Sequence, residues 1–467
     1  MDRKRASFAL AVLFAINTMN FFDRQVLGVV GEQIRKEWTL SDTALGALGT
    51  AFTLVYAIVG LPLGRLADTL RRRTILAVGV FVWSALTAAS GVCRSFTQLF
   101  VVRLGVGLGE ASCAPAASSL IGDLFPAAKR SNALSVFMLG LPIGIALSFL
   151  VGGPIAKAYG WHLTFFIAAV PGAVCAIAAL FMVEPRRGAA EAHAVGTRRR
   201  EGSALRLVFS IPSMWPIVVS GALHNFNMYA IGAFLAPLLM RYHKMDIAHA
   251  GYYAMAVYGL SGVPGLVLGG LAADALGKRS RRGRMTLSAC TFLAAAPLTY
   301  AALESPAMSP AGFAVPMSLG VAAMYVYYSA TYSTIQDLVE PSLRGTAMAA
   351  YFCAMYLLGG SLGPIVMGRL SDHFAQAAAG AAGITEITAK SLEPFKGVGL
   401  HGAMYVIPAL NVVLAACMFV ASRTVPRDMA RLEAWMRATA GGGDPPPSDD
   451  VRDPALGVRT AGTTGAA

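Results

Sequence analysis

Two stretches of the chain repeat one pattern at a fixed spacing: Asp123-Leu-Phe-Pro-Ala-Ala-Lys-Arg130 and Asp337-Leu-Val-Glu-Pro-Ser-Leu-Arg344. Their Asp, Leu and Arg residues coincide when the two stretches are superposed. A second pair, Gly64-Arg-Leu-Ala-Asp68 and Gly270-Leu-Ala-Ala-Asp274, leads in both copies into a run of basic residues. Two matches at corresponding places indicate that the chain consists of two halves related by duplication.

Each repeat follows an apolar segment that is long enough to cross a membrane. We expect twelve such segments, near residues 8–30, 45–67, 74–92, 99–121, 132–154, 163–183, 214–240, 251–273, 285–303, 311–335, 345–367 and 402–422. Within hydrocarbon only helices and closed barrels satisfy the backbone, and apolar runs of this length form helices. The sequence therefore predicts an all-α polytopic membrane protein made of two pseudo-symmetric six-helix halves.

The segments also give the domain organisation. We expect an N-terminal bundle at 1–183, a central cytoplasmic loop at 184–213, a C-terminal bundle at 214–422 and a cytoplasmic tail at 423–467. The outer segment 368–401 is long enough to carry a short re-entrant or surface piece. In the tail, residues 427–437 predict a short helix lying on the membrane. Triple-glycine and triple-proline runs predict disorder after residue 440.

The composition agrees with a membrane protein. Of the 467 residues, 56% are hydrophobic and 13% are charged, and the mean hydropathy is +0.58. Soluble chains carry about 25% charged residues, so a soluble multidomain enzyme is excluded. The net charge is nevertheless +13. This excess suggests nucleic-acid binding until the basic residues are located along the chain.

The basic residues gather on one side of the expected membrane. With the N-terminus inside, 26 of the 38 Lys and Arg residues lie in inner loops and tails, 9 lie outside, and Arg24, Arg65 and Arg103 lie within spans. This asymmetry predicts cytoplasmic termini, in a bacterial inner membrane. The basic runs face one side and lack interleaved aromatics, so nucleic-acid binding is excluded.

Other classes of protein lack support in the sequence. The six cysteines lie mostly in apolar stretches without CxxC pairs, so neither a disulfide framework nor a metal site is expected. The absence of a P-loop excludes a primary pump. The scattered histidines argue against a membrane enzyme, and the duplication argues against a receptor. The first apolar run lacks a cleavage site, which favours an uncleaved helix over a signal peptide. We expect no cofactor.

The Gly-x-x-x-Asp motif with its basic loop resembles the signature of the major facilitator superfamily, over roughly residues 7–422. The second copy keeps the pattern as Gly270, Asp274, Gly277, Lys278 and Arg279. The first copy departs from it, with Arg71 at the place of the second glycine. The resemblance implies twelve helices in two halves that rock around a central site, and a monomer is expected.

The same resemblance implies a cytoplasmic gate of charged residues at helix ends. In the first half, Asp68 and Arg72 would pair with neighbouring helix ends and with Asp123. Carboxylates and arginines at helix ends that face a basic loop also form a breakable ionic latch on physical grounds alone. The expected gate residues are Asp68, Arg72, Asp123, Arg130, Asp274, Asp337 and Arg344.

Ionisable groups inside a span are costly and mark transport pathways or proton relays. Asp23 lies roughly 24 Å along the first span, at a rise of 1.5 Å per residue, and Arg103 of the fourth span lies at a similar depth. A carboxylate and an arginine at matching depth can neutralise one another. Protonation of Asp23 would release Arg103, which gives a basis for proton coupling. Glu110 lies two turns further in, on the same face as Arg103.

The string from Asn20 to Arg24, together with Arg103-Leu-Gly-Val-Gly-Leu-Gly-Glu110-Ala-Ser, resembles the spinster branch of this superfamily. Animal members of that branch move sphingosine-1-phosphate or lysophospholipids. By this resemblance Asp23 is the protonation site, and Arg24, Arg103 and Glu110 line the central cavity. The expected proton-coupling residues are Asp23 and Glu110. The expected substrate-binding residues are Asn17, Asn20, Arg24, Arg103, Glu110, Asn225 and Asn227.

The function expected from these features is proton-coupled secondary transport of lipid-like amphipathic or organic anionic substrates. The residues themselves do not report a long acyl chain, and a cationic pair beside aromatics suits an aromatic carboxylate equally well. Two alternatives within the superfamily therefore stay open, an organic-anion symporter and a drug/proton antiporter. The expected partners are the small-molecule or lipid substrate, protons and the bilayer.

Overall fold

The computed structural model describes the chain except residues 1–2, 126, 186–202, 308, 341–342 and 441–467. The side chains of residues 3, 61, 64–65, 67–69, 127–131 and 438–440 are not described. The described residues form helices joined by short connections, and they contain no strand. The disorder expected after residue 440 concerns residues that lie outside the described part of the chain.

The N-terminal half contributes six spans. They are α1 (Arg3–Glu37), α2 (Asp42–Thr69), α3 (Arg72–Ser90), α4 with α5 (Phe96–Glu110, Cys113–Leu124), α6 with α7 (Ala127–Met138, Gly140–Tyr159) and α8 (Trp161–Leu180). The short α9 (Ala204–Phe209) precedes the second half.

The C-terminal half also contributes six spans. They are α10 (Met214–Arg241), α11 with η1 and α12 (Ile247–Ala254, Met255–Leu260, Gly262–Arg279), α13 (Gly283–Leu303), α14 (Pro310–Leu338), α15 with η3 and α16 (Arg344–Ala354, Met355–Gly360, Leu362–Ala381) and α19 (Val406–Ala440). The short helices α17 (Ala389–Leu392), η4 (Glu393–Phe395) and α18 (Lys396–Met404) precede α19.

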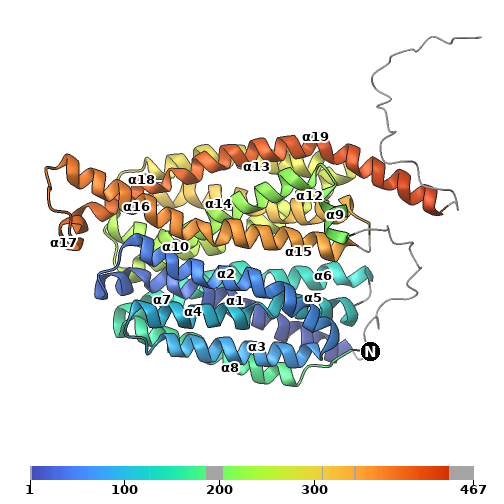
Figure 1. Ribbon diagram of the computed structural model, residues 1–467, viewed down its shortest axis with the longest axis horizontal. Coiled ribbons are helices and arrows are strands. Elements are labelled where there is room, and N and C mark those ends of the chain that lie inside the picture. Colours follow the sequence, from blue (N-terminus) through green and yellow to red (C-terminus); the bar gives the residue numbers. More distant parts are fainter. Residues whose placement is uncertain (1–2, 126, 186–202, 308, 341–342, 441–467) are drawn as a thin grey trace, which may run out of the picture.

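The long helices run side by side, and the two halves lie one above the other (Figure 1). We call the end where α1 begins and α19 finishes the tail end, and the opposite end, which holds α17 and the turn from α1 to α2, the turn end. All twelve predicted spans are present among the described residues. Eleven helical stretches are long and apolar enough to cross a membrane by length and composition alone. The remaining span, α10, carries His224, Asn225 and Asn227, all buried.

The structure corrects the prediction of a separate surface helix at 427–437. The last span, α19, continues through Pro426 to Ala440 as one helix. Asp428 is buried and accepts hydrogen bonds from the Ser213 backbone N–H (2.9 Å) and from its hydroxyl (2.5 Å). This contact ties the extension to the start of α10. Within 368–401, where the sequence predicts a short re-entrant or surface piece, α16 continues to Ala381 and is followed by the short helices α17 and η4.

Several spans lose regular helical geometry near the middle of the protein. α4 ends at Glu110 and α5 begins at Cys113, and the eighth and eleventh spans contain the π-helical segments η1 and η3. Such π-helical turns are frequent at functional sites. Tyr258 of η1 and Tyr356 of η3 both line a cavity between the halves. The irregular backbone therefore borders the candidate substrate site.

The two halves contact each other through α1 against α10, α2 against α16, and α7 against α11 and η1. The helices α2 and α16 approach each other closely. A Cβ atom added to Gly46 would lie 2.2 Å from the carbonyl oxygen of Pro364. The packing of the halves in this conformation therefore requires glycine at this position.

Candidate functional site

A cluster of ionisable side chains lies between α1 and α4. Glu110, the last residue of α4, accepts hydrogen bonds on one carboxylate oxygen from Arg24 Nε and from Asn20 Nδ2, each at 2.8 Å. The Glu110 side chain is fully buried and that of Arg24 is 7% exposed. An ion pair shielded from water in this way is stabilised by its own hydrogen bonds and is costly to break.

The Arg24 guanidinium also faces aromatic rings from both halves. Its Cζ lies 4.3 Å from the centroid of the Tyr56 ring and 4.9 Å from that of Phe21. Its Nη1 donates a hydrogen bond to the Tyr229 hydroxyl of the other half, at 3.3 Å. Rings and a guanidinium at these distances attract each other. Arg24 is thus held by one carboxylate, by aromatic rings of both halves and by one hydrogen bond across the halves.

Asp23 and Arg103 are buried beside this pair, but they form no ion pair with each other. Asp23 accepts a 3.5 Å hydrogen bond from the Thr87 hydroxyl, and its Oδ1 has no partner among the described residues. Arg103 Nε and Nη1 likewise have no hydrogen-bond partner in the described part of the chain. The matching depth predicted an Asp23–Arg103 pair, whereas in this conformation the ion pair joins Arg24 to Glu110.

A cavity lies between the halves next to this cluster. The N-terminal half contributes the two arginines Arg24 and Arg103, whereas the C-terminal half contributes a wall of tyrosines: Tyr229, Tyr258, Tyr325, Tyr328, Tyr332 and Tyr356. Apolar side chains complete the lining, among them Phe21, Phe52, Leu141, Ile145 and Met228. The cavity is cationic on one side and aromatic on the other, which suits an anion with an apolar or aromatic body.

Three of the predicted substrate-binding residues line this cavity: Arg24, Arg103 and Asn225. Asn20 and Glu110 lie behind it in the charged cluster. Asn17 and Asn227 do not line it, because their side chains serve packing in this conformation. Asn17 donates to the Phe137 carbonyl of α6 at 2.7 Å. Asn227 donates to Asn411 Oδ1 at 3.0 Å, within the C-terminal half.

At the tail end, the predicted gate residues of the first half form an ionic network. Arg72 is buried, pairs with Asp123 of α5, and donates from Nε to Glu184 at 2.9 Å. Glu184 also accepts from the Arg73 backbone N–H at 2.9 Å. These contacts hold α3, α5 and the end of α8 together within one half. The side chains of Asp68 and Arg130 lie outside the described residues.

The second half repeats this arrangement with Arg284, which is not among the predicted gate residues. Asp337 pairs with Arg284, at the start of α13, and Arg284 also lies 3.9 Å from Asp274. Arg344 instead donates to the Gln336 carbonyl at 3.1 Å. Each of these tail-end pairs joins helices of the same half. In this conformation they brace the halves individually rather than latch one half to the other.

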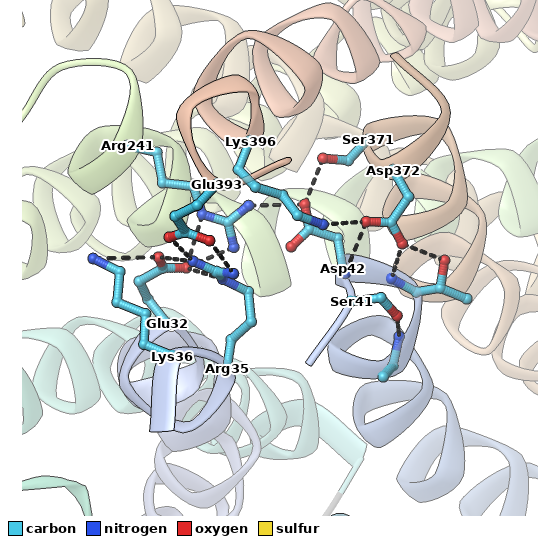
Figure 2. A network of polar contacts seen from close by, with 12 residues as sticks. Glu32, Arg35, Lys36, Ser41, Asp42, Arg241, Ser371, Asp372, Glu393 and Lys396 are labelled. Carbon is cyan, nitrogen blue, oxygen red and sulfur yellow. Dashed lines mark hydrogen bonds and ion pairs between the residues drawn. The ribbon is translucent and has the colours of Figure 1, made fainter. Parts of the chain in front are cut away.

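A charged network that the sequence did not predict joins the halves at the turn end (Figure 2). Arg241 of α10 donates from Nη2 to Glu32 at 2.6 Å and from Nη1 to Asp42 at 2.8 Å. Glu32 also binds Arg35 at 2.9 Å, and Arg35 binds Glu393 of the other half at 2.6 Å. Glu32 and Asp42 are fully buried. The network crosses from α1 and α2 to α10 and η4.

The start of α2 is capped from the other half (Figure 2). Asp372 of α16 accepts hydrogen bonds from the backbone N–H groups of Asp42 (3.1 Å) and Thr43 (2.8 Å). A carboxylate at a helix N-terminus satisfies free N–H groups and the helix dipole. Lys396 binds the same carboxylate at 2.5 Å. The turn end is therefore closed by a network of paired and mostly buried charges.

The signal for this network was present but indirect. The sequence does place Asp42 and Arg241 at the ends of spans on the same side of the membrane. Their identity as partners depends on which helices of the two halves meet, and hydropathy does not report that. Arg284 and Glu184 were missed at the tail end for the same reason.

Comparison with known proteins agrees with this architecture. The family model described as Major Facilitator Superfamily matches residues 13–364. The chain is 30% identical to an MFS-type efflux pump of Mycolicibacterium smegmatis, over 91% of this chain and 95% of that protein. It is 26% identical to a sphingosine-1-phosphate transporter of Danio rerio, over 78% of this chain and 76% of that protein.

Among solved structures, the fold is similar to that of a bacterial homologue of the human lysosomal transporter spinster in an inward-facing, unoccupied conformation. The TM-score is 0.78 at 27% identity, over 92% of this chain and 99% of that one. The family match covers most of the chain and includes the spans that carry the charged cluster. The chain therefore belongs to the Major Facilitator Superfamily, and within it resembles the spinster transporters.

Proposed function

We propose that this protein is a proton-coupled secondary transporter of amphipathic anions, working by alternating access in a bacterial inner membrane. The observation that carries the proposal is the cluster beside the cavity: two arginines and two carboxylates, of which only Arg24 and Glu110 are paired. A substrate cavity and, next to it, a buried carboxylate without an ion-pair partner provide a binding site and a proton acceptor. Coupling of transport to protons requires both.

The coupling follows from the cost of an unpaired charge in hydrocarbon. Asp23 has no cationic partner within ion-pair distance, so its ionised form lacks the compensation that Glu110 receives from Arg24. Uptake of a proton removes that cost. Loss of the proton gives Asp23 a charge that attracts Arg103 or Arg24 and so redistributes the ion pairs. The membrane potential contributes roughly 2.3 kcal/mol per proton for each 100 mV.

Alternating access is supported by the difference between the two ends. Buried ion pairs cross the halves at the turn end, whereas the tail-end pairs described above stay within a half. With cytoplasmic termini, as the basic loops favour, this is a state closed to the outside. The similar spinster structure is named as inward-facing. The protein carries out this cycle as a monomer.

The substrate class follows from the asymmetry of the cavity. Arg24 and Arg103 provide positive charge for an anionic group, while tyrosines and aliphatic side chains provide a surface for an apolar body. The name of the zebrafish relative, a sphingosine-1-phosphate transporter, describes a molecule with both features. We therefore favour lipid-like amphipathic anions over small hydrophilic ones.

A second candidate is proton-driven efflux of drug-like organic compounds. It is favoured by the Mycolicibacterium relative, which is named as an efflux pump. The same aromatic wall accommodates flat organic molecules. The two candidates differ in the substrate rather than in the mechanism.

The test is transport in proteoliposomes with an imposed proton gradient, using the wild type and Asp23→Asn. The substrates are lysophospholipids, sphingoid phosphates, aromatic acids and cationic drugs, first ranked by thermal shift of the purified protein. Asp23→Asn should abolish proton-driven uptake and retain exchange or binding. Asp246→Asn, which changes an exposed carboxylate at the turn end, is the matched control and should keep both activities. Unchanged proton-driven transport by Asp23→Asn contradicts the assignment.

A further inference from the structure

A groove at the tail end of the N-terminal half is lined by three elements that meet there. They are the start of α1, the turn between α2 and α3, and the end of α8. Four cationic side chains, those of Lys4, Arg5, Arg71 and Arg73, face into it together with one carboxylate, that of Glu184. The groove therefore carries a strong excess of positive charge.

The one carboxylate of the groove does not neutralise Arg5 and Arg71. Glu184 is already engaged, because it accepts from the Arg72 side chain and from the Arg73 backbone N–H, each at 2.9 Å. The Arg73 guanidinium donates to the Met182 carbonyl at 3.2 Å. Among the described residues, Arg5 and Arg71 form no ion pair. Arginine side chains in this setting suit a phosphate group, because two N–H groups of one guanidinium can donate to two phosphate oxygens.

The groove also has an apolar side that continues into the bundle surface. Phe8 and Phe181 line it, and Phe181 is 71% exposed. Phe181 continues a stripe of exposed residues on α8, made of Val170, Val174 and Ile177. Their spacing of three and four residues places them on one face of the helix. In a membrane protein an exposed apolar stripe along a span faces the acyl chains.

We propose that this groove binds an anionic phospholipid, with its phosphodiester headgroup among the arginines and an acyl chain along the α8 stripe. A basic pocket between spans, at the end where the basic loops gather, has the chemistry to recognise such a headgroup. Basic residues that only set the orientation of the protein in the membrane require neither a groove nor aromatic side chains. The stripe that starts at Phe181 favours a lipid over a free phosphate.

A lipid bound in the groove should affect the stability of the N-terminal half, because Glu184 connects the groove to the neighbouring helices. Glu184 and Asp123 both bind Arg72, so the floor of the groove belongs to the network that braces α3, α5 and α8. A headgroup on Arg71 and Arg73 draws the turn before α3 toward the end of α8. Binding should therefore stabilise the N-terminal half.

The test is native mass spectrometry and thermal unfolding of the full chain in neutral detergent, with phosphatidylglycerol, phosphatidylcholine or glycerol phosphate added. The groove variant is Arg5→Gln/Arg71→Gln. The matched control is Arg279→Gln/Arg282→Gln, which removes the same charge from exposed positions at the same end of the other half. Neither variant changes the charged cluster beside the substrate cavity.

Wild type and control should retain phosphatidylglycerol in preference to phosphatidylcholine and gain thermal stability from it. The groove variant should lose about thirtyfold in affinity, since each basic residue near the membrane surface contributes about 1 kcal/mol. Glycerol phosphate should not compete. The proposal is overturned if the groove variant retains phosphatidylglycerol as well as the wild type does. It is also overturned if the control loses as much affinity for this lipid as the groove variant. Competition by glycerol phosphate at the same concentration overturns the assignment to a lipid.

Discussion

Arg241 donates a hydrogen bond to Asp42 across the interface between the halves, 2.8 Å away, and both side chains are almost fully removed from water. The same guanidinium binds Glu32, so one cation of the C-terminal half binds two carboxylates of the N-terminal half. Desolvated charges of this kind are costly when one partner is missing. The closed turn end therefore depends on Arg241 more than on any exposed pair.

Arg241→Gln leaves Glu32 and Asp42 without this cation and should open the turn end. Removal of one partner from a buried pair costs about 3–5 kcal/mol. The measurement is the distance between spin labels on Thr39 and Lys390, exposed positions on opposite halves at this end. The distance distribution should shift to larger values.

Lys157→Gln is the control for this experiment. Lys157 binds Asp246 at 3.2 Å, also across the halves, but both side chains are substantially exposed. Exposed pairs contribute less than about 1 kcal/mol, so the distance should stay at its wild-type value. If both variants opened the turn end equally, burial would not be what matters there.

Gly46→Ala should also disfavour the closed turn end, through sterics rather than charge. Its new Cβ would lie 2.2 Å from the Pro364 carbonyl oxygen, so α2 and α16 have to separate. Overpacking of this kind costs about 1–3 kcal/mol. The same spin-label distance, read together with the thermal unfolding midpoint, reports the effect.

Gly60→Ala provides the comparison within the same helix, because nothing lies within 4 Å of its added Cβ. Replacement of a helical glycine by alanine without strain stabilises by roughly 0.5–1 kcal/mol. Gly60→Ala should therefore be neutral or more stable. Equal destabilisation by the two substitutions would remove the role assigned to the α2–α16 contact.

Glu110→Gln should weaken binding of the substrate and lower stability, because Arg24 then lacks its carboxylate. The double variant Arg24→Gln/Glu110→Gln contains neither charge and should be more stable than either single variant. Thermal unfolding of the four proteins gives the coupling energy of the pair. A coupling energy near zero would mean that the ion pair contributes nothing in the membrane, and unchanged substrate affinity in Glu110→Gln would remove Glu110 from the site.

Asp428→Ala should release the extension of α19 from the start of α10. The Ser213 N–H then loses its acceptor in a buried position, which costs about 1–3 kcal/mol. Hydrogen exchange of the backbone amides of residues 429–437 should become faster. Glu433→Ala removes a partly exposed carboxylate of the same helix, which pairs with Arg281, and should leave the exchange rate unchanged. Equal protection in both variants would contradict the anchor.

The sequence by itself determined the spans, the two halves and the residues that carry charge within the membrane. Hydropathy is a local property, so a window of some twenty residues is enough to recognise a span. The duplication was readable from the motifs at Asp123 and Asp337. The depth of Asp23, Arg103 and Glu110 followed from the helical rise.

Only the tertiary structure decided which of these residues are partners. Successive residues of a helix point about 100° apart, so Asp23 and Arg24 face different neighbours although their depth is nearly the same. The depth along the spans predicted an ion pair between Asp23 and Arg103. The rotation of α1 relative to α4 instead pairs Arg24 with Glu110. The Arg241–Asp42 contact depends on how the two halves pack. That packing comes from surfaces far apart in the sequence, and no local pattern encodes it.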